Sequence, residues 1–220
     1  MKIKLIKFKS VKSTNDIAIQ LIKKKKTQPT LISSERQIKG RGTMGKKWIS
    51  QKGNLFMSIF FEINQKKINF RQFAILNAFL LRKLVANFIS RDIKIKWPND
   101  LLYNKEKICG ILQEVISYDQ KNYLIVGIGL NTNISPKNKS FSSTSLKNII
   151  NKRIDNRKIL KNTKNIYEKF LIENKKFSFN ELKKIMKAVA VHIEMIANKI
   201  NQKKNSVVAL FWVFVMGFKF

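Results

Sequence analysis

The chain has 220 residues and a mass of 25.7 kDa, which predicts one domain of about 150 residues and a smaller appendage. Hydrophobic residues make up 44% of the sequence, so global disorder is excluded. A single cysteine, Cys109, and a single histidine, His192, exclude a disulfide framework, a cysteine-based zinc cluster and a histidine-rich metal site.

The charge is strongly positive, because 45 lysines and arginines against 13 aspartates and glutamates give a net charge of +32. Arginine is scarce beside lysine, although arginine is the usual residue for bidentate contacts to phosphate. Lysine, asparagine and isoleucine all have AT-rich codons, so genome composition explains much of the charge. Attraction to phosphates or to an acidic protein partner is the functional interpretation, and the two explanations are compatible.

Apolar periodicity predicts an α/β alternation over the first two thirds of the chain. In chain order the predicted elements are strand 3–8, helix 13–26, strand 31–34, loop 35–53, strand 54–63, helix 71–89, strands 93–97, 101–103, 107–116 and 123–130, and helices 157–176 and 180–189. Ser13 with Asp16 three residues on resembles a capping box at the start of the first helix. The helix at 71–89 is predicted to place one apolar stripe on a core: Phe73, Leu76, Leu80, Leu84 and Phe88.

The two ends of the chain carry different signals. The N-terminus has no long apolar segment of the kind found in signal peptides, so we expect a cytoplasmic protein. Residues 207–216 form an uninterrupted apolar run that is shorter than the ~20 residues of a membrane span. We interpret this run as a buried or paired strand. A frame-altered or truncated end and a membrane anchor are the alternatives.

Two segments combine glycines with cations. Residues 40–48 read Gly-Arg-Gly-Thr-Met-Gly-Lys-Lys-Trp, in which the glycines let a ligand approach the backbone and the cations suit a phosphate or carboxylate. Lys107, in an apolar strand with Gly110 three residues on, can project a cation into a pocket floored by bare backbone. A solvated loop and a strand-end lysine that reaches water are the simpler interpretations.

Two other segments place polar residues at the ends of predicted strands. Residues 96–100 read Lys-Trp-Pro-Asn-Asp, and the proline fixes Asn99 and Asp100 where α/β sheets bind ligands. An aspartate beside an asparagine suits Mg²⁺. Residues 127–131 read Gly-Ile-Gly-Leu-Asn, which indicates close approach of another group that Asn131 can hydrogen-bond. An ordinary turn and a β-bulge are the alternatives.

Taken together and in this order, these segments resemble the bacterial biotin–protein ligase family. The family signature is Ser-Thr-Asn near the start of the catalytic domain, a Gly-Arg-Gly loop ending in Trp, Lys-Trp-Pro-Asn-Asp, Lys-x-x-Gly-Ile-Leu-x-Glu and Gly-x-Gly-x-Asn. This chain carries the five blocks at 13–15, 40–48, 96–100, 107–114 and 127–131. The resemblance covers residues 1–175 and implies a mixed, largely antiparallel sheet with packed helices.

The resemblance implies an ATP-dependent ligase with biotin as its substrate. The biotin carboxylate attacks the α-phosphate of ATP to give biotinyl-5′-AMP and pyrophosphate. A lysine of a biotin carboxyl carrier protein then attacks that mixed anhydride, and Mg²⁺ is the expected metal. Neither step needs a protein nucleophile, but both need positioned substrates and neutralised phosphate charge.

The same resemblance assigns roles to individual residues. The cations expected to promote catalysis are Arg41, Lys96 and Lys107. The residues expected to bind biotin are Ser13, Thr14, Asn15, Gln37, Gly40, Arg41, Gly42, Thr43, Lys107 and Gly110. The residues expected to bind ATP are Lys46, Trp48, Lys96, Asn99, Asp100 and Asn131, with Asp100 as the Mg²⁺ ligand.

Three features depart from the family pattern. Thr43 stands where the family commonly has an arginine that orders the loop over the adenylate, so weaker retention of the intermediate is expected. Lys46 replaces a second common arginine and keeps the charge without the planar fork. Residues 176–220 match the family's small C-terminal β-barrel poorly, so we expect a divergent or missing barrel after a catalytic domain at 1–175.

The expected partner is the carrier domain of a carboxylase, and a homodimer is left open. The residues before Ser13 leave no room for the DNA-binding module of some family members, so we expect neither specific DNA binding nor repressor activity. No membrane partner is expected.

Other functions remain open at this point. One is a lipoate or octanoate ligase or transferase of the same superfamily. The transferases use a cysteine nucleophile, and Cys109 and Lys107 would share a face of a regular strand. A small buried strand residue is the simpler interpretation of Cys109. A non-catalytic nucleic-acid-binding protein would use the net charge, and an inactive ligase would explain the unusual C-terminal sequence. His192 has no assigned role.

Overall fold

The computed structural model describes residues 1–64, 70–90, 92–137 and 141–176. Its strands are β1 (Lys4–Phe8), β2 (Thr30–Ser34), β3 (Leu55–Ile63), β4 (Lys94–Lys96), β5 (Asp100–Tyr103), β6 (Glu106–Tyr118) and β7 (Lys121–Leu130). Its helices are α1 (Thr14–Lys23), α2 (Phe70–Ile89), α3 (Leu146–Ile150) and α4 (Asn156–Lys176), with a 3-10 turn, η1, at Thr43–Gly45. The predicted helix at 180–189, the apolar run at 207–216 and the appendage from 177 onward lie outside the described residues.

All seven strands form one mixed sheet in the order β1-β2-β3-β7-β6-β5-β4. β1 and β2 are parallel, and every other neighbouring pair is antiparallel, which confirms the predicted fold class. The long β6–β7 hairpin lies near the middle of the sheet and turns at Asp119 and Gln120, both of which have positive φ. This hairpin carries two of the five sequence blocks.

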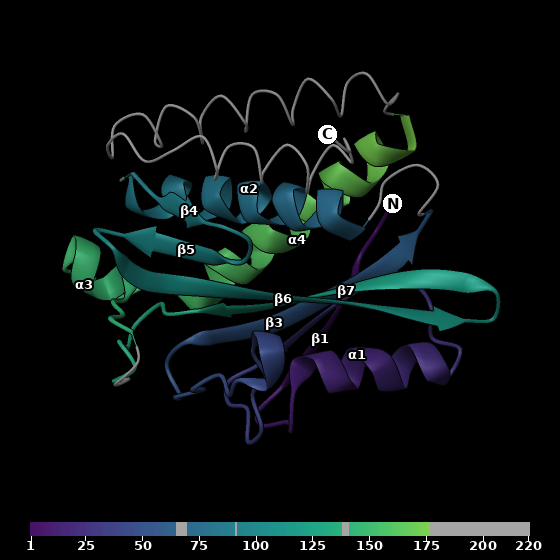
Figure 1. Ribbon diagram of the computed structural model, residues 1–220, viewed down its shortest axis with the longest axis horizontal. Helices are drawn as coiled ribbons and strands as arrows, with labels where there is room; N and C mark the ends of the chain where they lie inside the picture. Colours follow the sequence, from purple (N-terminus) through teal and green to yellow (C-terminus); the bar gives the residue numbers. More distant parts are fainter. Residues whose placement is uncertain (65–69, 91, 138–140, 177–220) are drawn as a thin grey trace, which may run out of the picture.

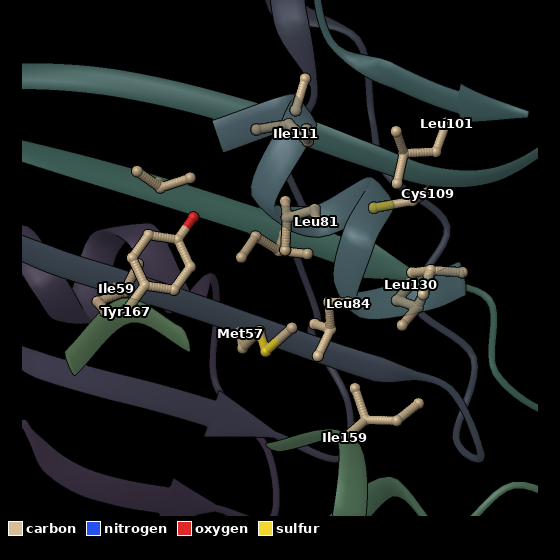
Figure 2. Packing of buried hydrophobic residues seen from close by; sticks show 14 of the residues in the cluster. Met57, Ile59, Leu81, Leu84, Leu101, Cys109, Ile111, Leu130, Ile159 and Tyr167 are labelled. Carbon is tan, nitrogen blue, oxygen red and sulfur yellow. The ribbon is translucent and has the colours of Figure 1, made fainter. Parts of the chain in front are cut away.

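The helices α2 and α4 cover one face of the sheet (Figure 1). Between them and the strands lies the larger apolar core, which includes Leu124. Figure 2 shows other members of this core, among them Met57, Ile59 and Tyr167. The predicted stripe of α2 is rotated slightly: Leu81 is buried, whereas Leu80 is only partly buried. Residues 72–89 are long and apolar enough for a membrane span, but half of this segment is buried in the fold.

The helix α1 covers part of the opposite face (Figure 1). Ala18 and Ile22 pack there on Phe60, Tyr123 and Ile125, which form a second, smaller core. Ile125 precedes two glycines, at 127 and 129, that continue the same face of β7. The N-terminus of α1 therefore faces a stretch of sheet that carries almost no side chains.

The short helix α3 was not predicted from the sequence. It has only five residues, which is too few to show a helical period. Ser145 caps it, since the Ser145 side chain accepts a hydrogen bond from the Asn148 amide at 3.3 Å.

Candidate active site

A cavity of about 730 Å³ lies over the glycine-bearing part of β6 and β7, beside the N-terminus of α1. Every predicted site residue except Gly40 lines it. Gly40 is buried within the loop 35–53 instead, where a Cβ would lie 2.6 Å from both Ser50 Oγ and the Trp48 carbonyl oxygen. Gly40 therefore shapes the loop 35–53, and a direct contact with substrate remains a prediction.

The floor of the cavity is bare backbone. Gly110 pairs with Gly129 across the β6–β7 ladder, and Gly127 pairs with a leucine. A Cβ on Gly129 would lie 2.3 Å from Trp48 Cε2, and one on Gly127 would lie 2.3 Å from Asn15 Oδ1. The ladder has no register shift at these glycines, so the interpretation as a β-bulge is wrong. The glycines are needed because two side chains lie directly on the strands.

One end of the cavity is polar and carries little net charge. Thr14 donates from its amide to Gln37 Oε1 at 2.8 Å and from its hydroxyl to the same oxygen at 3.1 Å. The Gln37 amide nitrogen donates to Ser50 Oγ at 3.0 Å. Ser58, fully buried on β3, donates to Asn15 Oδ1 and lies 2.7 Å from Thr14 Oγ1. These groups hold one another in fixed orientations at the start of α1.

Ser13 occupies the N-cap position of α1 with extended backbone, but its side chain makes no cap hydrogen bond. The predicted capping box is therefore wrong. Asp16 instead forms an ion pair with Arg41 at 2.9 Å, so its carboxylate is directed toward the loop. The Ser13 side chain remains part of the cavity wall.

Arg41 is held by carboxylates. Its Nη1 and Nη2 donate to Glu114 Oε1 and Oε2, each at 2.8 Å, and Nη2 also lies 2.9 Å from Asp16. Partial burial disfavours the guanidinium charge, but the hydrogen bonds and charges of Glu114 and Asp16 outweigh it and raise the pKa of Arg41 above its usual value. A contact between Arg41 and a substrate anion stays a prediction.

The other end of the cavity is cationic. Lys107 Nζ forms an ion pair with Asp100 Oδ1 at 2.7 Å without hydrogen-bond geometry, and both side chains are 17% exposed. The same ammonium lies over the rings of Trp48, at 5.1 Å, and Phe141, at 5.2 Å. Asn131 Oδ1 and Trp48 Nε1 are buried at this end with no hydrogen-bond partner among the described residues. A bound ligand can satisfy both atoms.

The cavity-lining residues include six cations and a single carboxylate, that of Asp100. The cations are Arg41, Lys46, Lys47, Lys96, Lys105 and Lys107. Such an excess of positive charge around a half-enclosed cavity favours a polyanion. Across the cavity, Thr43 Oγ1 in η1 accepts a hydrogen bond from Asn99 Nδ2 at 3.3 Å, which links the loop to the β4–β5 connection. The peptide bond between Trp97 and Pro98 in that connection is cis.

A β-bulge separates Lys107 from Cys109. The β5–β6 register shifts between Leu101, which faces Cys109, and Leu102, which faces Lys107. The extra residue, Ile108, resets the alternation of the strand. The expectation that Lys107 and Cys109 share a face is therefore wrong: Lys107 lines the cavity and Cys109 lies in the core.

Cys109 has none of the properties of a nucleophile. Figure 2 shows it among Leu81, Leu101 and Leu130, and its exposed fraction is 0%. Burial raises the pKa of its thiol to about 12, despite the opposing charge of Lys107. The simpler interpretation, a small buried strand residue, is confirmed.

Several residues of the site were not assigned from the sequence. Lys105 lines the cavity from the Asn104-Lys105 turn, in which both residues have positive φ. Phe141 and Ser142 form a wall beside Lys107, whose amide donates to the Ser142 carbonyl oxygen at 2.9 Å. The predicted strands 101–103 and 107–116 leave room for this turn, but local sequence does not show that its tip reaches the cavity. Glu114 is the last residue of the signature block at 107–114, and this position in the block could have indicated a role in the site.

Comparison with known proteins agrees with this fold and site. Residues 7–131 match the family model described as the biotin/lipoate A/B protein ligase family. The biotin protein ligase from Aquifex aeolicus, solved in complex with biotin and ATP, is 31% identical, with a TM-score of 0.68 over 82% of this chain and 75% of that chain. The fold is that of the biotin protein ligases, and the chain belongs to the biotin/lipoate A/B protein ligase family.

Two curated relatives extend the comparison. The bifunctional ligase/repressor BirA of Bacillus subtilis is 28% identical over 82% of this chain, and the biotin–[acetyl-CoA-carboxylase] ligase of Mycobacterium tuberculosis is 28% identical over 53% of it. The match spans 58% of the length of the first relative and 44% of the second.

Proposed function

We propose that this chain activates biotin with ATP as biotinyl-5′-AMP and transfers the biotinyl group to a lysine of a biotin carboxyl carrier protein. The observation that carries this proposal is the two-ended cavity, in which an ordered polar end and a cationic end share one glycine floor. The likeness to the Aquifex aeolicus enzyme, solved with biotin and ATP, supports it.

The polar end suits the ureido group of biotin, which both donates and accepts hydrogen bonds. Ser13, Thr14, Asn15 and Gln37 present hydroxyl and amide groups there, fixed by Ser58 and Ser50. The valeryl chain then crosses the glycines and brings the carboxylate to Lys107. The glycine floor, whose backbone groups are paired within the sheet, and the Trp48 ring suit that chain.

In the first step, a biotin carboxylate oxygen attacks the α-phosphorus of ATP. A new bond joins that oxygen to phosphorus, the bond from the α-phosphorus to the bridging oxygen breaks, and pyrophosphate leaves. Lys107, Lys96 and Lys46 offset the negative charge that concentrates on the phosphate oxygens. Asp100 keeps the Lys107 ammonium at the cavity wall.

In the second step, a neutral lysine amine of the carrier attacks the carbonyl carbon of the mixed anhydride. An amide bond forms, the bond from carbon to the phosphate oxygen breaks, AMP leaves, and the proton lost from the amine passes to solvent. The exposed rim of the cavity is basic, which favours an approaching carrier surface of opposite charge.

Asp100 and Asn131 fit a Mg²⁺ that arrives with the nucleotide. The described residues hold no cluster of three or more acidic, cysteine or histidine side chains that could bind a metal alone. Mg²⁺ needs few protein ligands when phosphates supply the rest. Asp100 offers a carboxylate, and Asn131 offers an amide oxygen that has no hydrogen-bond partner in the described part of the chain. When bound, it would supply further neutralisation of phosphate charge.

The test is ATP–pyrophosphate exchange by the purified chain with biotin, lipoate or octanoate. We expect exchange that needs both biotin and Mg²⁺. Exchange driven by lipoate or octanoate but not by biotin would favour the lipoate-ligase alternative. No exchange above background from folded protein would refute the adenylation step.

The transfer step needs its own measurement. We expect biotin to be incorporated into a carrier domain in the presence of ATP, and not into a carrier whose target lysine is replaced by arginine. Adenylation without transfer would limit the proposal to the first half-reaction.

A further inference from the structure

Glu114 lies on the cavity face of β6 and has no part in the reaction described above. Its two carboxylate oxygens are shared between two elements. Oε1 and Oε2 accept from the Arg41 guanidinium, and Oε2 also accepts from Asn15 Nδ2 at 2.7 Å. Its side chain is 25% exposed, so the contacts are partly shielded from water.

The first of these contacts holds the loop. Arg41 begins the tip of the loop 35–53, and its pairs with Glu114 and Asp16 fix that tip to β6 and α1. Within the tip, the Gly42 amide donates to the Lys46 carbonyl oxygen and the Trp48 amide donates to that of Gly40. Release of Arg41 would remove the ionic contacts of this turn to β6 and α1, and would leave it held by Trp48 on the glycine floor and by the Thr43–Asn99 hydrogen bond.

The second contact orients a substrate-binding side chain. Asn15 Oδ1 accepts from Ser58, and Asn15 Nδ2 donates to Glu114, with the Leu112 carbonyl oxygen further away at 3.5 Å. The amide is therefore fixed at both ends above Gly127. Without Glu114, the nitrogen of Asn15 loses its short, charge-assisted partner.

We propose that Glu114 is a positioning residue whose single carboxylate both clamps the Arg41 loop over the cavity and orients Asn15 for the substrate head group. Loop closure and head-group recognition are then coupled through one side chain. The substrate half of this inference rests on the proposed function, whereas the loop half rests on geometry alone.

Four variants test the loop-holding role of Glu114 separately from its role in orienting Asn15. Glu114→Ala removes both contacts, and Glu114→Gln keeps the side-chain volume and a neutral acceptor for Asn15 but loses the charged bidentate pair. Asp16→Asn weakens the loop clamp without touching Asn15. Glu62→Gln is the matched control, because Glu62 forms an exposed ion pair with Lys121 at 3.1 Å, away from the cavity lining.

The first readout is hydrogen exchange of the amides in residues 40–48, which requires no ligand. We expect exchange about threefold faster or more in Glu114→Ala, Glu114→Gln and Asp16→Asn, since exposed or partly exposed ion pairs have effects of this order. Glu62→Gln should match the wild type. Unchanged exchange in both Glu114 variants would overturn the proposal, and Glu114→Gln decides the matter if Glu114→Ala does not fold.

The second readout is the dissociation constant of biotin by calorimetry. We expect binding at least about tenfold weaker in Glu114→Ala, because a hydrogen bond to a charged group is lost, with smaller effects in Glu114→Gln and Asp16→Asn. Faster loop exchange with unchanged biotin affinity in Glu114→Ala would overturn the coupling. If the wild type binds no biotin, the proposed function fails, while the exchange data still decide whether Glu114 clamps the loop.

Discussion

The two faces of the β6–β7 hairpin differ in role over the same few residues: one face packs in the core, and the other forms the floor of the cavity. On one face Cys109, Leu124, Val126 and Leu130 are buried against α2 and α4 and contribute to the larger core. On the other face, glycines at 110, 127 and 129 leave bare backbone, and Asn15 from α1 and the Trp48 ring from the loop lie directly on it.

The contrast shows how the hairpin can carry a site without losing stability. A strand normally gains stability from both faces, and glycine forfeits packing on its side. Here the core face is continuous, so the strands keep their partners in the ladder while the cavity face accommodates Asn15, Trp48 and Lys107. Substitutions on the two faces should therefore have separable effects on stability and on activity.

The largest effect is expected on the core face. Leu124 has an exposed fraction of 0% and packs in the larger core, so Leu124→Ala should lower the free energy of unfolding by about 2–5 kcal/mol. Chemical denaturation measures this change. At temperatures where the variant remains folded, its pyrophosphate exchange should stay within a few-fold of the wild type. A folded but inactive Leu124→Ala would show that the two faces are not separable.

The next effect is expected on the cavity face. Lys107→Ala should lower the rate of adenylation by at least about 10²-fold, comparable to the loss of one donor that stabilises transition-state charge. The variant also leaves the Asp100 carboxylate without its ion-pair partner. Combining it with Asp100→Asn should restore any lost stability but not the rate.

Lys94→Ala provides the matched control, since Lys94 is an exposed lysine of β4 outside the cavity lining. Stopped-flow or pyrophosphate-exchange kinetics on all three variants would decide the matter. A near-normal rate in Lys107→Ala would mean that Lys107 serves only the strand.

Much of the fold and of the cavity lining could be predicted from the sequence. The strands and long helices follow apolar periods that each segment carries locally, and their observed ends lie within a few residues of the predicted ones. The signature blocks also predicted most of the residues that line the cavity, because each block places its polar side chains at the end of a strand or helix. Asn15, Trp48 and Lys107 are examples.

The errors share a physical cause, which is that pairing between elements overrides local pattern. The bulge at Ile108 depends on how β5 pairs with β6, so a regular alternation wrongly placed Lys107 and Cys109 on one face. The Asp16 carboxylate was predicted to cap its own helix, yet a distant guanidinium, that of Arg41, competes for it. Local sequence contains neither partner.

A smaller effect concerns the loop 35–53, which lies on the cavity face of the hairpin. Thr43 stands at a position where the resembled family commonly has an arginine, and here its hydroxyl accepts a hydrogen bond from the neutral Asn99 amide across the cavity. A hydrogen bond from a cation to the adenylate phosphate is worth about 1.5–3 kcal/mol. Thr43→Arg should therefore slow the release of biotinyl-5′-AMP by about tenfold or more.

Stopped-flow release of the adenylate from wild type and Thr43→Arg measures this difference. Thr43→Gln is a neutral control of comparable reach. Equal release rates in all three proteins would indicate that Lys46 or Lys47, which also line the cavity, already supplies the charge.

The smallest effect on activity is expected at Cys109, the one cysteine of the chain, which borders the site in sequence but faces the core. Its thiol pKa is raised from an ordinary 9.0 to about 12 by burial, so the folded protein should hold about 10³-fold less thiolate at pH 8 than the unfolded chain. Iodoacetamide should accordingly label Cys109 only on unfolding.

Because the folded state disfavours the ionised thiol, this residue's contribution to stability is complete below pH 9 and declines as the pH rises toward 12. Cys109→Ala should remove that alkaline component and leave ligation within a few-fold of the wild type, since the adenylate route uses no thiol. Rapid alkylation of the folded protein, or loss of ligation in a folded Cys109→Ala, would contradict the assignment of Cys109 to the core and favour thiol-based transfer.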